Sequence, residues 1–299
     1  MEKIGIILKA IGGFYYVRCE DKEYECKARG SFRKSGISPL VGDNVEFTAT
    51  DSSHGIVDKI LPRKNQMTRP PVANIDKLFI VSSFSSPEPN TFIIDKMTVI
   101  AEHSSIEPII VFNKCDEGDF SKFKKIYQNS GFKTFVVSAK DMVGLDNLKA
   151  EMSNCISAFT GNSGVGKSSI LNTLLGEDLI ATGEISEKLG RGRHTTRHTE
   201  LYPLPFGGFI ADTPGFSSLE LDSNDYELKE NLPYCFRDFR EHINNCKFTS
   251  CTHTKESGCG VIEAVNNGLI EPTRHKSYIE LFEKMKNLKP WEAKSKRNY

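Results

Sequence analysis

The sequence predicts three consecutive units: an all-β barrel, an α/β domain on a parallel sheet, and a mainly helical unit with a cysteine cluster. Five short strand-like segments separated by turn residues occupy the first 69 residues. Strand and helix patterns then alternate up to about residue 225, and cysteine and histidine gather between residues 246 and 259. A length of 299 residues suits two or three domains, and a hydrophobic content of 38% supplies their cores.

The overall composition excludes several classes of protein. The 39 basic and 39 acidic residues balance, so any nucleic-acid surface must be a local patch. No apolar run reaches the roughly 18 residues of a membrane span, and the first residues lack the apolar segment of a signal peptide. We therefore expect a cytoplasmic protein that does not bind membranes and whose 8 cysteines stay reduced.

Residues 1–69 predict a small barrel of the OB-fold type. Basic side chains lie in one polar loop and near the exit of this unit, where an OB-fold can bind RNA. An ordinary solvated face is the alternative for them. The predicted strands are 5–10, 14–19, 24–28, 41–47 and 55–60. The basic residues are Arg29, Arg33, Lys34, Arg63, Lys64 and Arg69.

Residues 70–225 predict an α/β domain that follows a stiff linker at 69–71. Strands that alternate with helices form a parallel sheet covered on both faces, and ligands gather at the carboxyl ends of its strands. The expected strands are 75–82, 108–112, 134–137, 155–159, 201–204 and 208–211. The expected helices are 91–103, 120–129, 145–152 and 169–175.

A phosphate-binding loop follows the strand at 155–159. Residues 161–168 match the pattern G-x-x-x-x-G-K-[ST] between a strand and a helix. The glycines let backbone N–H groups surround phosphate oxygens at a helix N-terminus. Lys167 would reach the β- and γ-phosphates, and the Ser168 hydroxyl would hold Mg²⁺. The predicted phosphate-binding residues are Gly161, Asn162, Ser163, Gly164, Val165, Gly166, Lys167, Ser168 and Ser169.

Two motifs at neighbouring strand ends predict that the base is guanine. N-K-x-D occupies 113–116, and S-A-K occupies 138–140. The Asp116 carboxylate can accept from guanine N1–H and the 2-amino group, a pair that adenine lacks. The remaining residues would meet the O6 and N7 edge or cover the base with lysine stems. The predicted base-binding residues are Asn113, Lys114, Asp116, Ser138, Ala139 and Lys140.

The segment 184–199 is rich in Gly, Arg and His, which predicts a loop outside the core. The pattern D-x-x-G follows at 212–215. Asp212 would hold Mg²⁺ through water, and the Gly215 N–H would meet the γ-phosphate. Thr196, or alternatively Thr195, would present its hydroxyl and carbonyl to Mg²⁺ and to the attacking water. Both segments are expected to be switches held by the γ-phosphate.

The motifs occur in an unusual order. Ras-like GTPases begin with the phosphate loop and end with N-K-x-D and S-A-K, whereas these two motifs come first here. Joining the old termini and cutting elsewhere builds the same sheet, so the order predicts a circularly permuted GTPase. The cut falls just after the segment 212–215.

Residues 226–299 contain the spacing C-x4-C-x-H-x5-C, formed by Cys246, Cys251, His253 and Cys259. Three sulfurs and one imidazole at this spacing suit one tetrahedral structural Zn²⁺. Buried core cysteines are the alternative, and the polar neighbours disfavour it. Helices are expected at 234–244, 260–267 and 277–288. The basic stretch 272–299 could contact RNA phosphates or be a solvated tail.

This combination of motifs, barrel and cysteine cluster resembles the RsgA family of circularly permuted GTPases, which depend on the small ribosomal subunit. The resemblance covers nearly the whole chain. It implies GTP/GDP as ligands, 16S rRNA of the small subunit as partner, a monomer when free, and slow GTP hydrolysis that the subunit stimulates late in its maturation. It also implies that His194, in the H-T-T stretch, is catalytic, although Arg191-Gly192-Arg193 before it departs from the family pattern.

The residues expected to act in hydrolysis are thus His194, Thr196 and Gly215. Phe216 stands where Ras-type enzymes carry a water-orienting glutamine, so intrinsic turnover should be slow. A P-loop kinase or ATPase is one alternative, but it would leave Asn113 and Asp116 without a role. An RNA- or zinc-binding module with an inactive nucleotide fold is another, and the presence of the catalytic-type side chains disfavours it.

Overall fold

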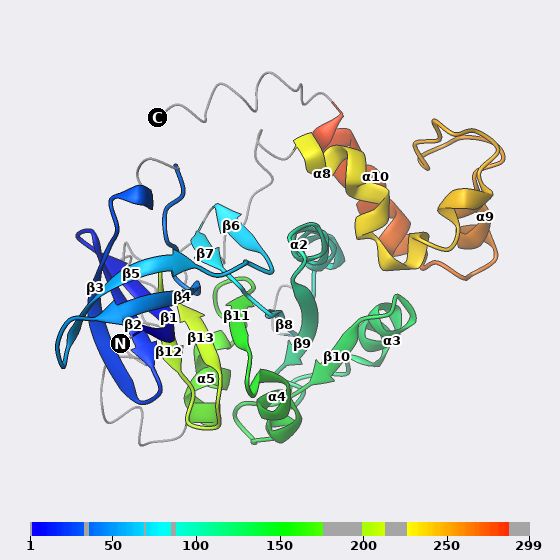
Figure 1. The fold of residues 1–299 in the computed structure, drawn as a ribbon. Coiled ribbons are helices and arrows are strands. Elements are labelled where there is room, and N and C mark those ends of the chain that lie inside the picture. Colours follow the sequence, from blue (N-terminus) through cyan, green and yellow to red (C-terminus); the bar gives the residue numbers. More distant parts are fainter. Residues whose placement is uncertain are drawn as a thin grey trace.

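The computed structural model describes residues 2–32, 36–68, 70–84, 88–175, 199–212 and 226–286. Figure 1 shows the barrel on one side of the central sheet and the C-terminal helices on the other, above α2. Within these described ranges, no helix combines the length and the apolar character that crossing a bilayer requires.

The first unit is a five-stranded barrel, as the sequence predicts. Strand β1 pairs with both β2 and β4, and β3 pairs in parallel with β5, which closes the barrel. Alternate side chains point inward and form a core that includes Val17, Tyr24 and Phe47. The strands are β1 (Glu2–Ile11), β2 (Phe14–Cys19), β3 (Lys22–Ala28), β4 (Asn44–Ala49) and β5 (His54–Ile60).

A short ribbon occupies the place of the predicted stiff linker. Strands β6 (Gln66–Thr68) and β7 (Pro71–Ala73) pair antiparallel, so Pro71 of the predicted linker is part of a strand, while Arg69 lies outside the described residues. The ribbon docks on the barrel, because the Ala73 N–H donates to Val41 O at 2.9 Å. Gly42 has φ +89°, and a Cβ there would lie 2.1 Å from Ala73 O, so this close approach requires glycine.

A buried ion pair fixes the same junction. The Asp43 carboxylate is fully buried, and it accepts from Arg63 Nε and Nη2 at 2.7 Å each. It also accepts from the Leu40 N–H at 2.7 Å. Arg63 is therefore a structural residue, and the prediction that it is free to bind RNA is not supported by its contacts.

The central sheet has the spatial order β10-β9-β8-β11-β13-β12. The first five strands are parallel, and β12 is antiparallel to β13. The sheet continues into the barrel through a pairing of Lys9 on β1 with Glu200 on β12, which the sequence did not reveal. The strands are β8 (Lys77–Ser83), β9 (Glu107–Asn113), β10 (Lys133–Val136), β11 (Ile156–Thr160), β12 (Glu200–Pro203) and β13 (Phe209–Asp212).

Helices cover both faces of this sheet, as predicted. Helices α2 and α3 pack into one core with Phe112, and α4 and α5 pack into a second core with Phe79 and Phe159. Right-handed crossovers between parallel strands place helices on opposite faces in this way. The helices are α2 (Thr91–His103), α3 (Ser121–Asn129), α4 (Leu145–Met152) and α5 (Lys167–Leu175).

The C-terminal unit is mainly helical but begins differently from the prediction. The expected helix at 234–244 is wrong, because three 3-10 turns occupy that region. Phe236 is extended between two of them, which lets its ring pack at 4.9 Å from the Phe239 ring. The elements are α8 (Tyr226–Asn231), η2 (Leu232–Cys235), η3 (Arg237–Phe239), η4 (Ile243–Asn245), α9 (Gly260–Asn266) and α10 (Pro272–Met285).

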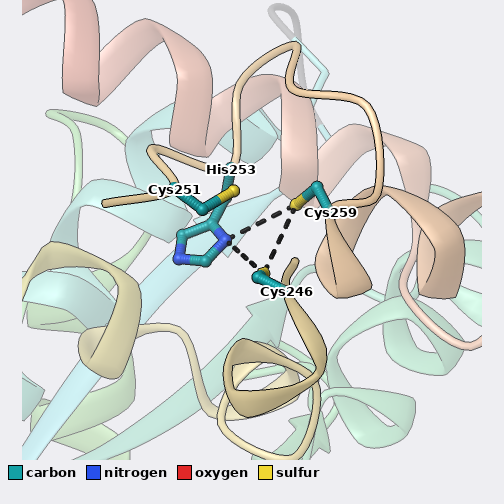
Figure 2. Close-up of side chains that lie close together, drawn as sticks. All are labelled: Cys246, Cys251, His253 and Cys259. Carbon is teal, nitrogen blue, oxygen red and sulfur yellow. Dashed lines mark hydrogen bonds between the residues drawn. The ribbon is translucent and has the colours of Figure 1, made fainter. Parts of the chain in front are cut away.

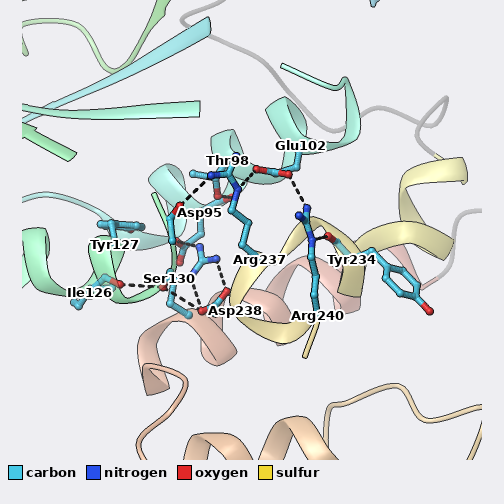
Figure 3. A network of polar contacts seen from close by, with 12 residues as sticks. Asp95, Thr98, Glu102, Ile126, Tyr127, Ser130, Tyr234, Arg237, Asp238 and Arg240 are labelled. Carbon is cyan, nitrogen blue, oxygen red and sulfur yellow. Dashed lines mark hydrogen bonds and ion pairs between the residues drawn. The ribbon is translucent and has the colours of Figure 1, made fainter. Parts of the chain in front are cut away.

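A buried arginine joins the C-terminal unit to the α/β domain. Arg274 of α10 is fully buried, and its Nη1 lies 2.7 Å from Asp95 Oδ1 of α2. Its Nη2 and Nε donate to the Asp238 carboxylate of η3 at 2.8 and 3.1 Å. Burial disfavours the charge, but the two carboxylates outweigh it and raise the pKa of Arg274. Figure 3 shows Asp95 and Asp238 facing each other across this junction.

A second set of ion pairs flanks the first. Arg237 Nη2 lies 2.7 Å from Glu107 Oε2, and Arg240 Nη2 lies 2.7 Å from Glu102 Oε2. Figure 3 shows Arg237 and Arg240 reaching Glu102 from the same side. The C-terminal unit is thus held on α2 and on the start of β9 by directional polar contacts.

Arg274→Leu should destabilise the protein by about 3–5 kcal/mol, because it leaves two buried carboxylates without their cation. Urea denaturation followed by circular dichroism would measure the change in unfolding free energy. The matched control is Lys276→Ala, which removes an exposed lysine of the same helix and should change the unfolding free energy by no more than about 0.5 kcal/mol. Equal stability of Arg274→Leu and the control would contradict the role of the buried network.

Candidate functional site

The predicted nucleotide residues converge on one edge of the central sheet. Strand β9 ends at Asn113, β11 runs into the phosphate loop, and β13 ends at Asp212. Ser138 follows β10 by two residues. Because these strands are parallel, their carboxyl ends meet, and the base and phosphate motifs become neighbours.

Two glycines of the phosphate loop are required by close contacts. A Cβ at Gly161 would lie 2.2 Å from Val81 O, and one at Gly166 would lie 2.2 Å from Asn113 Nδ2. Both glycines also have positive φ values, +141° and +91°. The loop is thereby pressed against β8 and the N-K-x-D segment, and α5 begins at Lys167, directly after Gly166. Such a helix N-terminus favours a bound phosphate group.

Lys167 lies across the phosphate loop. Its Nζ donates to Gly161 O at 2.7 Å and to Asn162 O at 2.9 Å. Burial lowers the pKa of Lys167, because the ammonium loses water around it. Phosphate oxygens are stronger acceptors for this ammonium than neutral carbonyls, so the side chain is placed to bind them.

Asn113 joins three loops of the site. Its Nδ2 donates to Val165 O of the phosphate loop at 3.0 Å, and its Oδ1 accepts from the Ala139 N–H of S-A-K at 3.2 Å. The residue is 1% exposed, so these bonds are shielded from water. The sequence predicted that Asn113 faces the base. The structure adds a role that the sequence did not reveal, which is to fix the base and phosphate loops relative to each other.

Asp116 is held ionised beside S-A-K. Ser138 Oγ donates to Asp116 Oδ1 at 2.8 Å, and Lys140 Nζ lies 3.6 Å from Oδ2. The serine bond, with a smaller contribution from Lys140, lowers the pKa of Asp116. Ser138 is itself fixed, because its Oγ accepts from the Asp141 N–H at 3.1 Å. The carboxylate can therefore accept two N–H groups from one base edge at neutral pH.

Thr173 is a neighbour of the site that sequence reasoning missed. Its Oγ1 donates to Ser169 O at 2.9 Å and lies 3.4 Å from Ala139 O. No motif marks this threonine, because its contact with S-A-K arises only when α5 packs beside that loop. The predicted residues His194, Thr195, Thr196, Gly215 and Phe216 lie outside the described residues, as does the side chain of Asp212.

The cysteine cluster forms a compact set of four ligand atoms. Cys246 Sγ lies 3.4 Å from His253 Nδ1 and 3.8 Å from Cys259 Sγ, and Cys259 Sγ lies 3.5 Å from the same nitrogen. With Cys251, all four atoms lie within 4.8 Å of one another, and Figure 2 shows the side chains gathered in one place. Tetrahedral ligands of one zinc ion lie about 3.8 Å apart for two sulfurs and about 3.5 Å for sulfur and nitrogen. The cluster fits one Zn²⁺.

The surroundings of the cluster agree with this chemistry. Burial raises the pKa of the Cys251 thiol to about 12, so a cation is needed to hold several thiolates in this small volume. Helix α10 supports the loop, because Tyr278 Oη donates to Thr252 O at 2.8 Å and His275 Nε2 lies 2.7 Å from His253 O. The backbone around the ligands is thus fixed by the same helix that carries Arg274.

A carboxylate shapes the turn between the second and the last cysteine. Glu256 accepts from the N–H groups of Thr252 and Thr254 at 3.0 Å and of Lys255 at 3.1 Å. Burial favours its protonation, but these bonds and one from the Thr252 hydroxyl overcome that effect and lower its pKa to about 2.

Two family models match the chain. The model of the RsgA N-terminal domain matches residues 4–57, and the model of the RsgA GTPase matches residues 60–222. The chain belongs to the RsgA GTPase family. It is accordingly an enzyme that hydrolyses GTP.

Full-length relatives and solved structures agree with this membership. The small ribosomal subunit biogenesis GTPase RsgA of Caldanaerobacter subterraneus subsp. tengcongensis is 46% identical over 303 residues, which cover 100% of this chain and 99% of that protein. The crystal structure of YloQ, a circularly permuted GTPase, matches with a TM-score of 0.80 at 34% identity over 97% of both chains. The structure of YjeQ from Thermotoga maritima matches with the same score and identity over 97% of this chain and 100% of that one. The circular permutation predicted from the motif order is confirmed.

Freshly purified RsgA-family protein of this sequence should contain about one Zn²⁺ per chain, measured by elemental analysis. Cys251→Ser should lose the metal and loosen the C-terminal unit, because a structural zinc site contributes directly to folding. GDP binding should persist, since the α/β domain has its own cores. Cys19→Ser, outside the cluster, is the control and should keep its zinc. Untreated protein without zinc would rule out the metal site.

Proposed function

We propose that this GTPase binds the small ribosomal subunit, is stimulated by it, and acts in late maturation of the 30S particle. The observation that carries the proposal is a family match over the whole chain, together with a guanine-type site whose loops are joined by Asn113. The relative from Caldanaerobacter is named for small ribosomal subunit biogenesis. We further propose that the protein acts as a monomer in the cytoplasm and binds 16S rRNA.

The barrel offers a surface suited to RNA. A hollow between the β1–β2 turn and the end of β3 is lined by Phe14, Tyr15, Lys27, Arg29 and Phe32. Lys27 Nζ lies 5.1 Å from the centre of the Phe14 ring. Aromatic rings stack on unpaired bases and the cations neutralise phosphates, so this combination supports binding of a single-stranded segment.

The nucleotide site supports the following division of tasks. Asp116 would select guanine, Lys167 and the backbone of the phosphate loop would bind the phosphates, and Ser168, Thr196 and Asp212 would hold Mg²⁺. The metal ion supplies charge neutralisation at the phosphates. His194, with Thr196 and Gly215, would orient the attacking water, because Phe216 has neither donor nor acceptor. The assignments to His194, Thr196, Gly215 and Phe216 rest on the sequence.

The proposal is tested by pelleting the protein with purified small subunits and measuring turnover with and without them. We expect association that depends on a GTP analogue and hydrolysis that rises when small subunits are added. Large subunits serve as the control and should do neither. Turnover that does not change with small subunits would contradict the proposal and would leave a GTPase without a ribosomal role.

Asp116→Asn should weaken GDP binding by roughly 2–4 kcal/mol, because a charge-assisted pair of hydrogen bonds is lost. The amide places a donor where xanthine has an acceptor, so xanthosine diphosphate should bind better than to the original protein. Competition against a fluorescent GDP would measure both affinities. Asp119→Asn is the control, because the bonds of Asp119 within the described residues are local ones, accepted from the N–H and the hydroxyl of Ser121. Unchanged GDP affinity of Asp116→Asn would remove the guanine assignment.

His194→Ala should bind the GTP analogue and the small subunit nearly normally, while stimulated turnover falls about 10²-fold or more. That factor is typical of a lost positioning or acid–base group. The control is His54→Ala, which removes an exposed imidazole on the barrel. Single-turnover hydrolysis on saturating small subunits is the measurement. A variant that retains full stimulated activity would show that His194 is not part of the mechanism.

A further inference from the structure

The turn that carries Asp116 is supported from two sides. The Glu117 N–H donates to Lys114 O at 2.9 Å and closes the turn. On one side, the Cys115 N–H donates to Val137 O at 3.1 Å, which ties the turn to the chain leaving β10. On the other side lies Gly118, two residues after Asp116, and its surroundings are unusual.

Gly118 lies directly against an aromatic ring. A Cβ at this position would be 2.4 Å from Cδ1, 2.5 Å from Cγ and 2.6 Å from Cε1 of Phe84. Separations this short are not tolerated, so one of the two groups would have to move. The backbone of Gly118 does not have a left-handed φ. The glycine is therefore required by the ring and not by its own conformation.

The ring of Phe84 has little freedom to yield. It packs edge-on against Phe120 with ring centres 5.5 Å apart, and Phe120 stacks on Phe112 at 5.0 Å. Phe112 and Phe120 are buried in the core beneath α2 and α3. Because protein interiors are closely packed, a group that is pushed against this set of rings displaces the less tightly packed of its neighbours. That neighbour is the turn at 114–118, in which Asp116 and Glu117 are exposed.

We propose that Phe84 is a positioning residue for guanine selectivity: its ring supports the backbone at Gly118 and so sets where the Asp116 carboxylate lies beside Ser138. The inference rests on the proposed role of Asp116 in reading the base. A bidentate pair needs both carboxylate oxygens in line with two N–H groups, and hydrogen bonds weaken steeply when they are tilted. A small shift of the turn would therefore break one of the two hydrogen bonds between Asp116 and the base before it breaks both.

The experiment compares GDP with inosine diphosphate, whose base lacks the 2-amino group and can make only one of the two bonds. Gly118→Ala should lower GDP affinity about tenfold and inosine diphosphate affinity about twofold or less, so the preference for guanine narrows. The matched control is Gly30→Ala, where a Cβ meets no atom within 4 Å and φ is not left-handed. An unchanged ratio of the two affinities in Gly118→Ala would overturn the proposal.

Phe84→Ala provides an independent variant, which remains informative if Gly118→Ala folds poorly. Loss of the ring should also lower the ratio of GDP to inosine diphosphate affinity, because the turn at 114–118 loses its support. When both substitutions are combined, Gly118→Ala should add no further loss, since the ring that it would strike is gone. A full additional loss in the double variant, or a preference in Phe84→Ala equal to that of the original protein, would count against the proposal.

Two further measurements separate the possible failures. Asp116→Asn is assayed in parallel: if it keeps the preference for guanine, the proposed role of Asp116 fails, whereas if it loses the preference and Gly118→Ala keeps it, only the present inference fails. Melting temperatures are recorded for every variant. A role confined to stability would lower the melting temperature and leave the ratio of GDP to inosine diphosphate affinity unchanged, which would overturn the proposal.

Discussion

Parallel pairing of β11 between β8 and β13 determines where each loop of the nucleotide site begins. Ala158 is level with Leu78 on one side and Ala211 on the other, so the three strands reach the same edge in register. The close contact of Gly161 with Val81 O is a consequence of this register. A one-residue slip would turn every buried side chain to the opposite face, which the two helical layers do not permit. The pairing does not depend on chain order, which explains why a permuted chain can build the same site.

In the permuted chain, the sheet that carries the nucleotide site is attached directly to the barrel. Strand β12 follows the segment that contains the predicted switch threonine, and it pairs directly with β1 of the barrel at Glu200 and Lys9. Leu8 and Val41 of the barrel pack in the same core as Ile80 and Phe112 of the α/β domain. The barrel is therefore joined to the GTPase sheet by both hydrogen bonds and a shared core. A domain that is attached in this way moves together with β12, whereas a domain on a flexible linker can move independently.

Helix α10 attaches the C-terminal unit to the α/β domain, on the other side of the sheet from the barrel. Within two turns it carries Arg274, which bonds to Asp95 of α2 and Asp238, and His275 and Tyr278, which contact the backbone of the cysteine loop. The conformation of the cysteine cluster and the position of the C-terminal unit on α2 thus depend on the same helix. Other arrangements of these elements would leave a buried charge unpaired, so the ion pairs of Arg274 favour this one geometry.

The sequence by itself determined the elements and motifs whose signals are local. The apolar spacing gave the bounds of α2 and α4 correctly, since an amphipathic helix shows its period over its own length. The four residues of the candidate zinc site were recognised from their spacing for the same reason. The tertiary structure decided what depends on residues far apart in the chain. Four features arise in this way from a neighbour on another element. They are the β6–β7 ribbon, the 3-10 turns around Phe236, the ion pair of Arg63 with Asp43, and the contact of Gly118 with Phe84. Such contacts have no period or spacing in the sequence, because only packing brings their partners together.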